Sequence, residues 1–418
     1  MPAGRDGESD VNASPPLSAG VGSEKSAAAS GPLAGMRVID LTTARSGPTC
    51  VRQLADLGAD VIQVAKAGVH ELQDSDSWNL HRNKRSIVVD LQSDAGRDIL
   101  LRLAERADVL VENWRPSVKT RLRIDPKVLW VVNPRLVYAS ISGYGQEGPY
   151  ANRPGLDQVA QGMGGLMSVT GPPGTGPWRA GIAVADLAAG TFLTQGVLAA
   201  LMVRERTGKG QWVHTSLLEA MVYLMDFQAV RWVIDKEIPK QTGNEHPTLP
   251  AMGTFRTRDG SMNIAQLSGF DRFFSAIGVP HLASDPRFVD DAGRHAHRAE
   301  LNSAIQEALL SRTTEEWIRA IADDIACGPV LSMNEVFADP QVRHLELTRT
   351  VEHPTEGLIE VLRLPLTFSD TPASVRSGPP LPGAHTKEVL LELGFSAKRI
   401  AELTTAGIVA VNPAEQVP

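Results

Sequence analysis

Cysteine is scarce in this chain, with only Cys50 and Cys327 among 418 residues, far apart along the sequence. Two distant cysteines exclude a disulfide framework and do not have the spacing of a metal site, so we expect no bound metal. Scarce cysteine suits a reducing compartment, and we predict a cytoplasmic protein. A net positive charge is also lacking, because the formal net charge is −7. This balance is the opposite of a nucleic-acid-binding footprint, so we predict no nucleic-acid partner.

No apolar run is long enough to cross a membrane. The longest uncharged run, Leu187–Val203, has 17 residues and is diluted by Thr191, Thr194 and Gln195, whereas a bilayer needs roughly 20 predominantly apolar residues. We therefore predict no membrane association and a helix packed on all sides inside the protein. A glycine-rich dinucleotide fingerprint is also missing, since only Gly47 follows the first predicted strand, and this argues against a nicotinamide dehydrogenase.

The composition that remains is that of a globular enzyme. Hydrophobic residues make up 42% of the chain and charged residues 21%, which is ordinary for a folded soluble protein. A length of 418 residues is enough for two domains. Residues 1–30 are rich in glycine, alanine, serine and proline, and we interpret them as a disordered tail with no assigned role.

Strands and helices alternate through the first half of the sequence. Short apolar runs at 36–41 and 59–64 enclose a helix at 49–57, which is a β-α-β unit and the start of an α/β fold. Further strands are expected at 83–91, 108–111, 135–141 and 212–215, with a helix over 93–106 that Ser93 caps. The loops after these strands carry basic and aromatic side chains, as ligand-binding loops of open α/β sheets do. Taken one at a time, these side chains are more often solvated charges or core aromatics.

The later segments indicate a second, smaller α+β domain. A helix is expected over 217–235, a polar linking loop over 241–253 and a hairpin over 254–267. A charged helical stretch follows over 270–325, then short strands, and a last helix at 387–393. We predict a large domain from 31–225, a linker and small domain from 226–330, and a return to the large domain from 331–418.

Asp186 is the candidate catalytic residue. It precedes Ala188, Ala189 and Gly190 and begins an apolar helical pattern, so small neighbours leave room for a bulky partner. Free N–H groups at a helix start stabilise an anion. Burial raises the pKa of a carboxylate and a helix terminus lowers it, so the sequence leaves its charge state open. A plain helix cap explains the same spacing.

Six segments in a fixed order resemble class III coenzyme A transferases, the group of formyl-CoA transferase and carnitine CoA-transferase, which is related to α-methylacyl-CoA racemase. The segments are GMRVIDLTTARSGPTCVRQLADLGADVIQV, HRNKRSIVVDL, ADVLVENWRPSVKTRL, SISGYGQEGPYANRPGLDQVAQGMGGLMSVTG, VADLAAG and GKGQWV. The similarity covers about residues 33–395.

The resemblance implies a Rossmann-like large domain, a small domain and a homodimer whose subunits interlock. It assigns Asp186 as the catalytic aspartate and a coenzyme A thioester as substrate, with no tightly bound cofactor. Positions that match the CoA-binding residues of the family are Arg45, Ser46, Lys66, His81, Lys84, Asn113, Trp114, Arg115, Arg121, Leu122, Ser142, Gly143, Tyr144 and Gly145.

This chain departs from its relatives in ways that bear on the reaction. Racemases of this fold carry a histidine where Leu156 stands, and formyl-CoA transferase has a glutamine in place of Arg45. We expect a CoA transferase that passes through an aspartyl anhydride and an aspartyl-CoA thioester, with amides near Gly164–Gly165 or in the 241–253 loop as oxyanion donors. Arg45 suggests a dicarboxylic acid, such as succinate delivered as succinyl-CoA. The alternatives are an acyl-CoA racemase or epimerase, and a non-catalytic acyl-CoA-binding protein.

Overall fold

A seven-stranded sheet forms the centre of the protein in a computed structural model that describes residues 31–66 and 74–412. Its strands are β1 (Arg37–Asp40), β2 (Asp60–Ala65), β3 (Lys84–Val89), β4 (Val109–Glu112), β5 (Val137–Ser142), β6 (Trp212–Ser216) and β12 (Val409–Ala410). The strand order is β12-β3-β2-β1-β4-β5-β6, and every pair is parallel except β12 with β3. The predicted α/β class with a parallel sheet is confirmed. The predicted tail, residues 1–30, lies outside the described residues.

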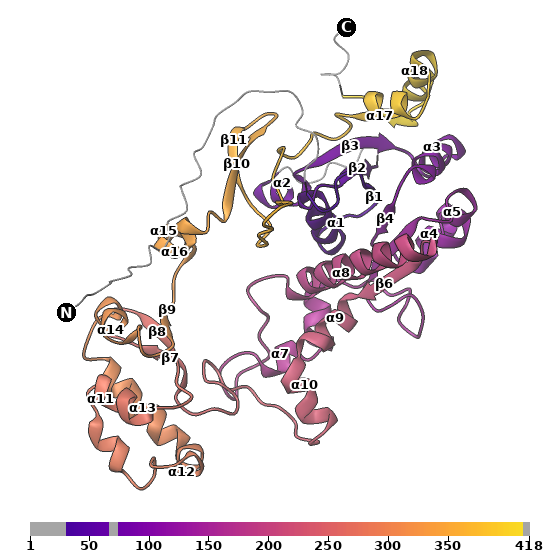
Figure 1. Ribbon diagram of the computed structural model, residues 1–418. Coiled ribbons are helices and arrows are strands. Elements are labelled where there is room, and N and C mark those ends of the chain that lie inside the picture. Colours follow the sequence, from indigo (N-terminus) through magenta and orange to yellow (C-terminus); the bar gives the residue numbers. More distant parts are fainter. Residues whose placement is uncertain (1–30, 67–73, 413–418) are drawn as a thin grey trace, which may run out of the picture.

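Helices cover both faces of this sheet (Figure 1). On one face, α1 (Ser46–Asp56) and α8 (Val184–Thr207) share a core with β1, β4 and β5. On the other face the core includes α3 (Asp94–Glu105), α5 (Pro126–Val132), α17 (Thr386–Glu392) and α18 (Ala397–Thr405). The chain order reverses at β1, which pairs with both β2 and β4. A ligand crevice is expected there, outside the carboxyl ends of the strands.

A separate hydrophobic cluster surrounds a three-stranded antiparallel sheet of β7 (Met252–Arg256), β8 (Ser261–Ala265) and β9 (Cys327–Pro329). Its helical elements are α11 (Phe270–Ala276), the 3₁₀ helix η1 (Pro280–Ser284), α12 (Asp291–Ala296), α13 (Arg298–Leu309) and α14 (Thr314–Ile321). Its buried side chains are distinct from those of the central sheet. The predicted domain boundaries themselves stay a prediction.

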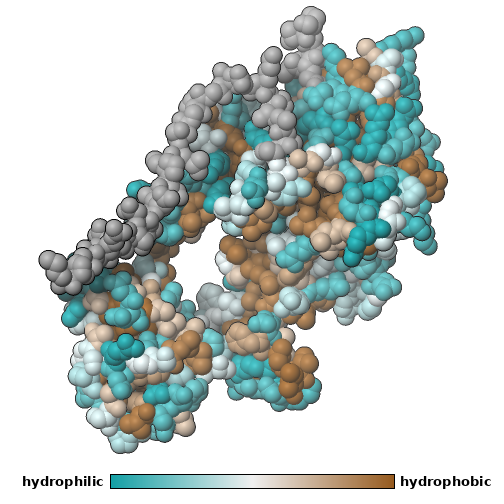
Figure 2. All heavy atoms as spheres, viewed as in Figure 1, coloured by the Kyte–Doolittle hydropathy of each residue, from teal (hydrophilic) through white to brown (hydrophobic). Residues whose placement is uncertain are grey.

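The remaining elements are shorter. They are α2 (Ser75–His81), α4 (Pro116–Leu122), α6 (Asp157–Met163), α7 (Leu166–Val169), α9 (Leu217–Leu224), α10 (Asp226–Val233), α15 (Met333–Ala338), α16 (Pro340–His344) and the hairpin of β10 (Thr348–His353) and β11 (Gly357–Leu362). The chain passes from the central sheet to β7 and returns through α15, α16 and β10 (Figure 1). The space-filling view shows an opening through the molecule between the two parts (Figure 2).

Two helix predictions need correction. The helix expected over 217–235 is broken into α9 and α10, because Asp226 adopts a left-handed φ of 42° that no continuous helix allows. The helix of the apolar run, α8, is not packed on all sides, since Met202 is 72% exposed. With 24 residues, α8 is long and apolar enough to cross a membrane, and 39% of its apolar window is buried inside the protein. Its packing against α1 and the sheet makes it a core helix of this fold.

Candidate active site

Asp186 lies in the first turn of α8, half-buried, where the start of α8 meets the start of α1. The Ser46 side chain, at the first position of α1, hydrogen-bonds its carboxylate. A Cβ atom on Gly190 would lie 2.6 Å from the backbone oxygen of Ser46, so only glycine allows this close approach. The small residues after Asp186 therefore allow helix α1 to pack closely against α8, and they do not leave an empty space beside the carboxylate.

Asp157 and Gln161, both on α6, hold the start of α8 in place. Asp157 Oδ1 accepts hydrogen bonds from the backbone N–H of Ala185 at 2.9 Å and of Asp186 at 3.3 Å. The fully buried Gln161 donates to Asp157 Oδ2 at 2.6 Å and to the Ile182 carbonyl at 3.2 Å. The residue that caps α8 is thus Asp157, and the Asp186 carboxylate is available for chemistry. Sequence reasoning missed this role, because α6 and α8 meet only in the folded protein.

Burial is the main cause that raises the pKa of Asp186, to about 6, and the negative charge of Asp157 raises it further. The positive charge of Arg45 and the hydrogen bond from Ser46 act in the opposite direction. Arg179, on the loop before α8, lies 4.0 Å from Asp157. The side chain is therefore mostly an ionised carboxylate at pH 7, in the form that attacks a carbonyl carbon.

This balance of charges predicts the pH dependence of the enzyme. If Asp186 is the nucleophile, it must lose its proton to attack, and kcat/KM should then rise with pH through about 6 and level off above it. Asp157→Asn keeps an acceptor oxygen near the α8 amides but removes the negative charge, so the inflection should move to lower pH. Rate profiles from pH 4.5 to 8.5 measure this. Glu205→Gln, at the exposed end of the same helix, is the control; an unmoved or raised inflection in Asp157→Asn would contradict the assignment.

Arg45 lies next to Ser46, and its guanidinium forms an ion pair with Asp76 on α2. Its positive charge is close enough to lower the pKa of Asp186. A carboxylate therefore already sits where we expected the second carboxylate of a dicarboxylic acid. A substrate carboxylate would have to share or displace Asp76.

A pocket of about 240 Å³ lies at the carboxyl ends of β1, β2, β3 and β4. Four predicted CoA-binding residues line it, and they are Lys66, Trp114, Arg121 and Leu122. Val64, Val118 and Leu122 supply apolar surface, and Lys66 and Arg121 are exposed cations at its rim. An apolar slot with cations at its edge suits a nucleotide base and its phosphates.

Asn113 and Arg115 flank Trp114 on the loop after β4. The Asn113 side chain exchanges two hydrogen bonds with the backbone of Thr43, and Arg115 is exposed. The loop Ser142–Gly145 follows β5, where the Ser142 hydroxyl accepts from the Gly145 N–H at 3.0 Å. Asn113 and Arg115 thus follow β4, which pairs with β1 at the crevice, whereas Ser142–Gly145 follow β5, one strand further away.

His81 and Lys84 are both buried, and their expected contact with CoA stays a prediction. The Lys84 ammonium is completely buried and lies 2.8 Å from Asp40 Oδ2 at the end of β1. It also lies 3.2 Å from His81 Nδ1, and burial lowers the pKa of His81 to about 3. In this arrangement Lys84 compensates the negative charge of Asp40 inside the core.

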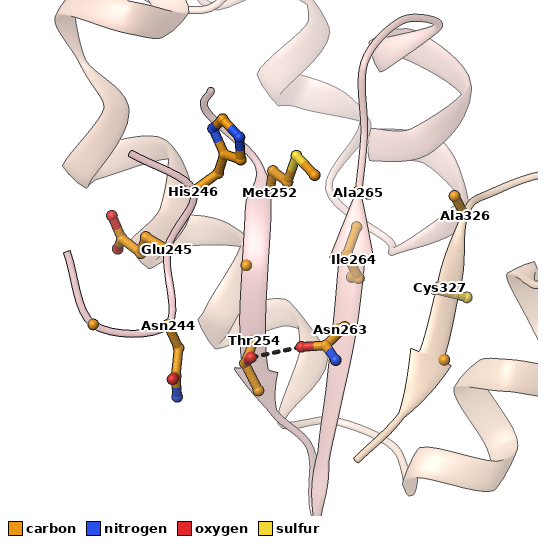
Figure 3. A pocket seen from close by; sticks show the side chains of 13 residues that line it. Asn244, Glu245, His246, Met252, Thr254, Asn263, Ile264, Ala265, Ala326 and Cys327 are labelled. Carbon is orange, nitrogen blue, oxygen red and sulfur yellow. Dashed lines mark hydrogen bonds between the residues drawn. The ribbon is translucent and has the colours of Figure 1, made fainter. Parts of the chain in front are cut away.

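The 241–253 loop forms one wall of a second pocket, of about 600 Å³. Figure 3 shows His246 and Asn244 of this loop beside Met252, Thr254 and Asn263 of the β7–β8 hairpin. The ring nitrogen Nδ1 of His246 accepts hydrogen bonds from the backbone of Thr248 and Leu249, so the neutral ring carries its proton on Nε2.

The expected oxyanion donors are already engaged within the chain. The N–H of Gly164 donates to the Ala160 carbonyl at 2.8 Å and that of Gly165 to the Gly162 carbonyl at 3.3 Å. The loop amides of Gly243 and His246 likewise donate to backbone carbonyls. Within residues 31–66 and 74–412 no group of three or more potential metal ligands occurs.

Comparison with known proteins shows the family of this chain. The model of CoA-transferase family III matches residues 33–386. The chain is 34% identical to a succinate–glutarate CoA-transferase of Agrobacterium fabrum, over 86% of this chain and 95% of that one. It is 32% identical to the human succinyl-CoA:glutarate CoA-transferase, over 90% and 89%, and 35% identical to a formyl-CoA:oxalate CoA-transferase of Streptomyces coelicolor, over 90% and 98%.

A solved structure has a similar fold. A CAIB/BAIF family protein from Brucella suis superposes with a TM-score of 0.78 at 31% identity, covering 87% of this chain and all of that one. The family match and this fold define an enzyme of the CoA-transferase class, which uses CoA thioesters as substrates. This chain belongs to CoA-transferase family III.

Proposed function

We propose that this protein moves CoA from an acyl-CoA donor to a carboxylic acid through covalent intermediates on Asp186. The observation that carries the proposal is the half-buried Asp186 carboxylate, held by Ser46 and by the α6 cap, with a pKa of about 6. Such a group is ionised at neutral pH but less solvated than a surface carboxylate, which favours nucleophilic attack.

The proposed transfer of CoA needs no external oxidant or base. The Asp186 oxygen attacks the thioester carbonyl, the carbon–sulfur bond breaks, and CoA leaves as a thiolate while a mixed anhydride forms. The thiolate then attacks the aspartyl carbonyl of the anhydride, releasing the donor acid and leaving an aspartyl-CoA thioester. The acceptor carboxylate opens this thioester to a second anhydride, and the returning thiolate attacks its acyl carbonyl. Acyl-CoA leaves, and Asp186 is restored.

The proposed substrates are dicarboxylic, with succinyl-CoA as donor. Arg45 supports this choice, because a guanidinium binds a carboxylate through two parallel hydrogen bonds, and it lies on the Asp186 side of the crevice. Relatives named for succinate and glutarate agree with a dicarboxylic pair.

A panel of acids tests this proposal. Succinyl-CoA supplied with glutarate, oxalate or acetate should give the corresponding acyl-CoA, fastest with a dicarboxylic acid. Arg45→Gln should raise KM for the dicarboxylic acids about tenfold, the loss of one charge-assisted contact, and leave KM for acetate unchanged. A uniform loss across all acids would count against pairing with Arg45, and no transfer to any acid would end the proposal.

A racemase is not favoured at this site. The position of the second proton carrier is Leu156, which is 70% exposed and cannot exchange a proton. Isotope from deuterated water should therefore not enter the α-carbon of a branched acyl-CoA during incubation with the enzyme. A binding protein without activity would form no adduct that hydroxylamine traps.

We further propose an interlocked homodimer in the cytoplasm. Large apolar side chains are exposed along α8, α9 and α10, including Met202 at 72%, Tyr223 at 74% and Val233 at 64%, and Figure 2 shows apolar surface over these helices. A single chain rarely leaves so much apolar surface in water. The cysteines are both free, which agrees with a reducing compartment. Light scattering should give twice the chain mass of 44.9 kDa, and a monomer at micromolar concentration would contradict the dimer.

A further inference from the structure

Arg45 and Asp76 form an ion pair between the start of α1 and the first turn of α2. Arg45 is the residue directly before α1, and the next residue, Ser46, hydrogen-bonds the Asp186 carboxylate. The positive charge of Arg45 lowers the pKa of Asp186. The guanidinium is therefore within electrostatic reach of the proposed nucleophile, while it donates a hydrogen bond to a carboxylate of the chain itself.

Helix α2 is held in place at its carboxyl end. Arg82, directly after the helix, forms an ion pair with Asp56 of α1 at 2.5 Å and donates to the side chain of Asn79 at 2.9 Å. The Asn79 side chain also accepts a hydrogen bond from the Leu362 N–H of β11 at 3.2 Å. These contacts fix α2 against α1 and β11, so Asp76 reaches the start of α1 because of how α2 is packed.

The two ion pairs between α1 and the α2 region differ in burial and therefore in strength. The side chains of Arg82 and Asp56 are 2% and 1% exposed, and separating them would leave unpaired charges in the core. The side chains of Arg45 and Asp76 are 33% and 50% exposed, and water and salt screen a pair of this kind. A second carboxylate can therefore displace Asp76 from Arg45 at little cost.

We propose that Asp76 is a specificity-determining residue, which occupies Arg45 until the second carboxylate of a dicarboxylic acid takes its place. This inference rests on the proposed function and on Arg45 as the partner of that carboxylate. A monocarboxylic acid brings no second anion to exchange for Asp76, so it leaves the ion pair intact. A dicarboxylic acid gains its charge-assisted contact with Arg45 only when Asp76 releases the guanidinium, and its affinity is reduced accordingly.

Calorimetric titration of the full-length protein with glutarate and with pentanoate, in the presence of CoA, tests this inference. Pentanoate has a methyl group where glutarate has its second carboxylate. Asp76→Asn should strengthen glutarate binding about threefold, because an exposed ion pair no longer competes for Arg45, and leave pentanoate binding unchanged. Asp76→Glu keeps the charge and should bind glutarate as wild type does. Adding Asp76→Asn to Arg45→Gln should change neither affinity, since the residue for which Asp76 competes is already gone.

Asp98→Asn is the matched control, because Asp98 forms an exposed ion pair with Arg102 on α3 and should change neither affinity. Thermal unfolding of each variant checks that the fold is retained. Equal strengthening for both acids, or strengthening that persists in Arg45→Gln, would show that Asp76 repels any anion and would overturn the inference. Unchanged glutarate affinity in Asp76→Asn, or no glutarate binding to either protein, would also overturn it.

The titration separates this inference from the proposed function, because it does not depend on turnover. The expected pattern of affinities in a protein that transfers CoA to no acid would end the proposed function alone. Transfer of CoA to dicarboxylic acids, with a glutarate affinity that Asp76→Asn does not change, would end this inference alone.

Discussion

Asp186→Ala should lower CoA exchange by at least about a thousandfold, because removing a covalent nucleophile leaves only binding and positioning. Affinity for CoA should change little, since no residue of α8 lines the pocket at the ends of β1–β4, where we expect the CoA nucleotide to bind. Initial rates with succinyl-CoA and glutarate measure the first effect, and calorimetric titration with CoA measures the second.

The same experiment has a chemical readout. Quenched wild-type enzyme should carry CoA or an acyl group on Asp186 during turnover, visible by mass spectrometry, and Asp186→Ala should carry none. Glu205→Gln removes a carboxylate from the exposed end of α8 and should retain both activity and adduct. Substantial turnover by Asp186→Ala, or an adduct on another residue, would show that the nucleophile has been misassigned.

Lys84→Met should reduce the free energy of unfolding by about 3–5 kcal/mol, the usual cost of leaving one partner of a buried ion pair without the other. Asp40 and Lys84 are both fully buried, 2.8 Å apart. The Thr42 backbone and hydroxyl also donate to Asp40, but they do not supply the lost positive charge. Urea unfolding followed by circular dichroism measures the change.

A double variant separates this structural role from a role in binding. Adding Asp40→Asn to Lys84→Met removes the uncompensated charge, so much of the lost stability should return. Arg102→Met breaks an exposed pair and should cost less than about 1 kcal/mol. If Lys84→Met unfolds at the wild-type urea concentration but binds CoA weakly, the predicted contact of Lys84 with CoA would be favoured over the structural role.

The strands and the first helices were predictable because their signals are local. Apolar runs placed β1 to β6 within a few residues of their observed bounds, and Ser93 caps α3 through the Gly96 N–H as expected. The break between α9 and α10 was not predictable, since residues 217–235 have an apolar helical pattern and the left-handed Asp226 has no local signal. The last helix, α18, was also missed beyond α17.

Some features of the candidate site could likewise be predicted from the sequence, and others could not. The position of Asp186 in the first turn of α8 follows from the sequence, as do the polar loops after the strands. The pairing of Arg45 with Asp76 and the burial of Lys84 with Asp40 were not visible, because their partners lie 31 and 44 residues away. Asp76 was not a candidate either, since a charged residue within a helix normally faces solvent.

The sequence by itself determined the α/β class, the family and the carboxylate at the start of α8, because hydrophobic periodicity and motif order are properties of neighbouring residues. Only the tertiary structure decided which residues surround that carboxylate. Asp157 of α6 caps helix α8, and the Ser46 side chain of α1 hydrogen-bonds to the Asp186 carboxylate. The charge of Asp157 raises the pKa of Asp186 and that of Arg45 lowers it. The physical reason is that these groups act through space over a few ångströms in a partly buried site, and the folded chain alone brings them together.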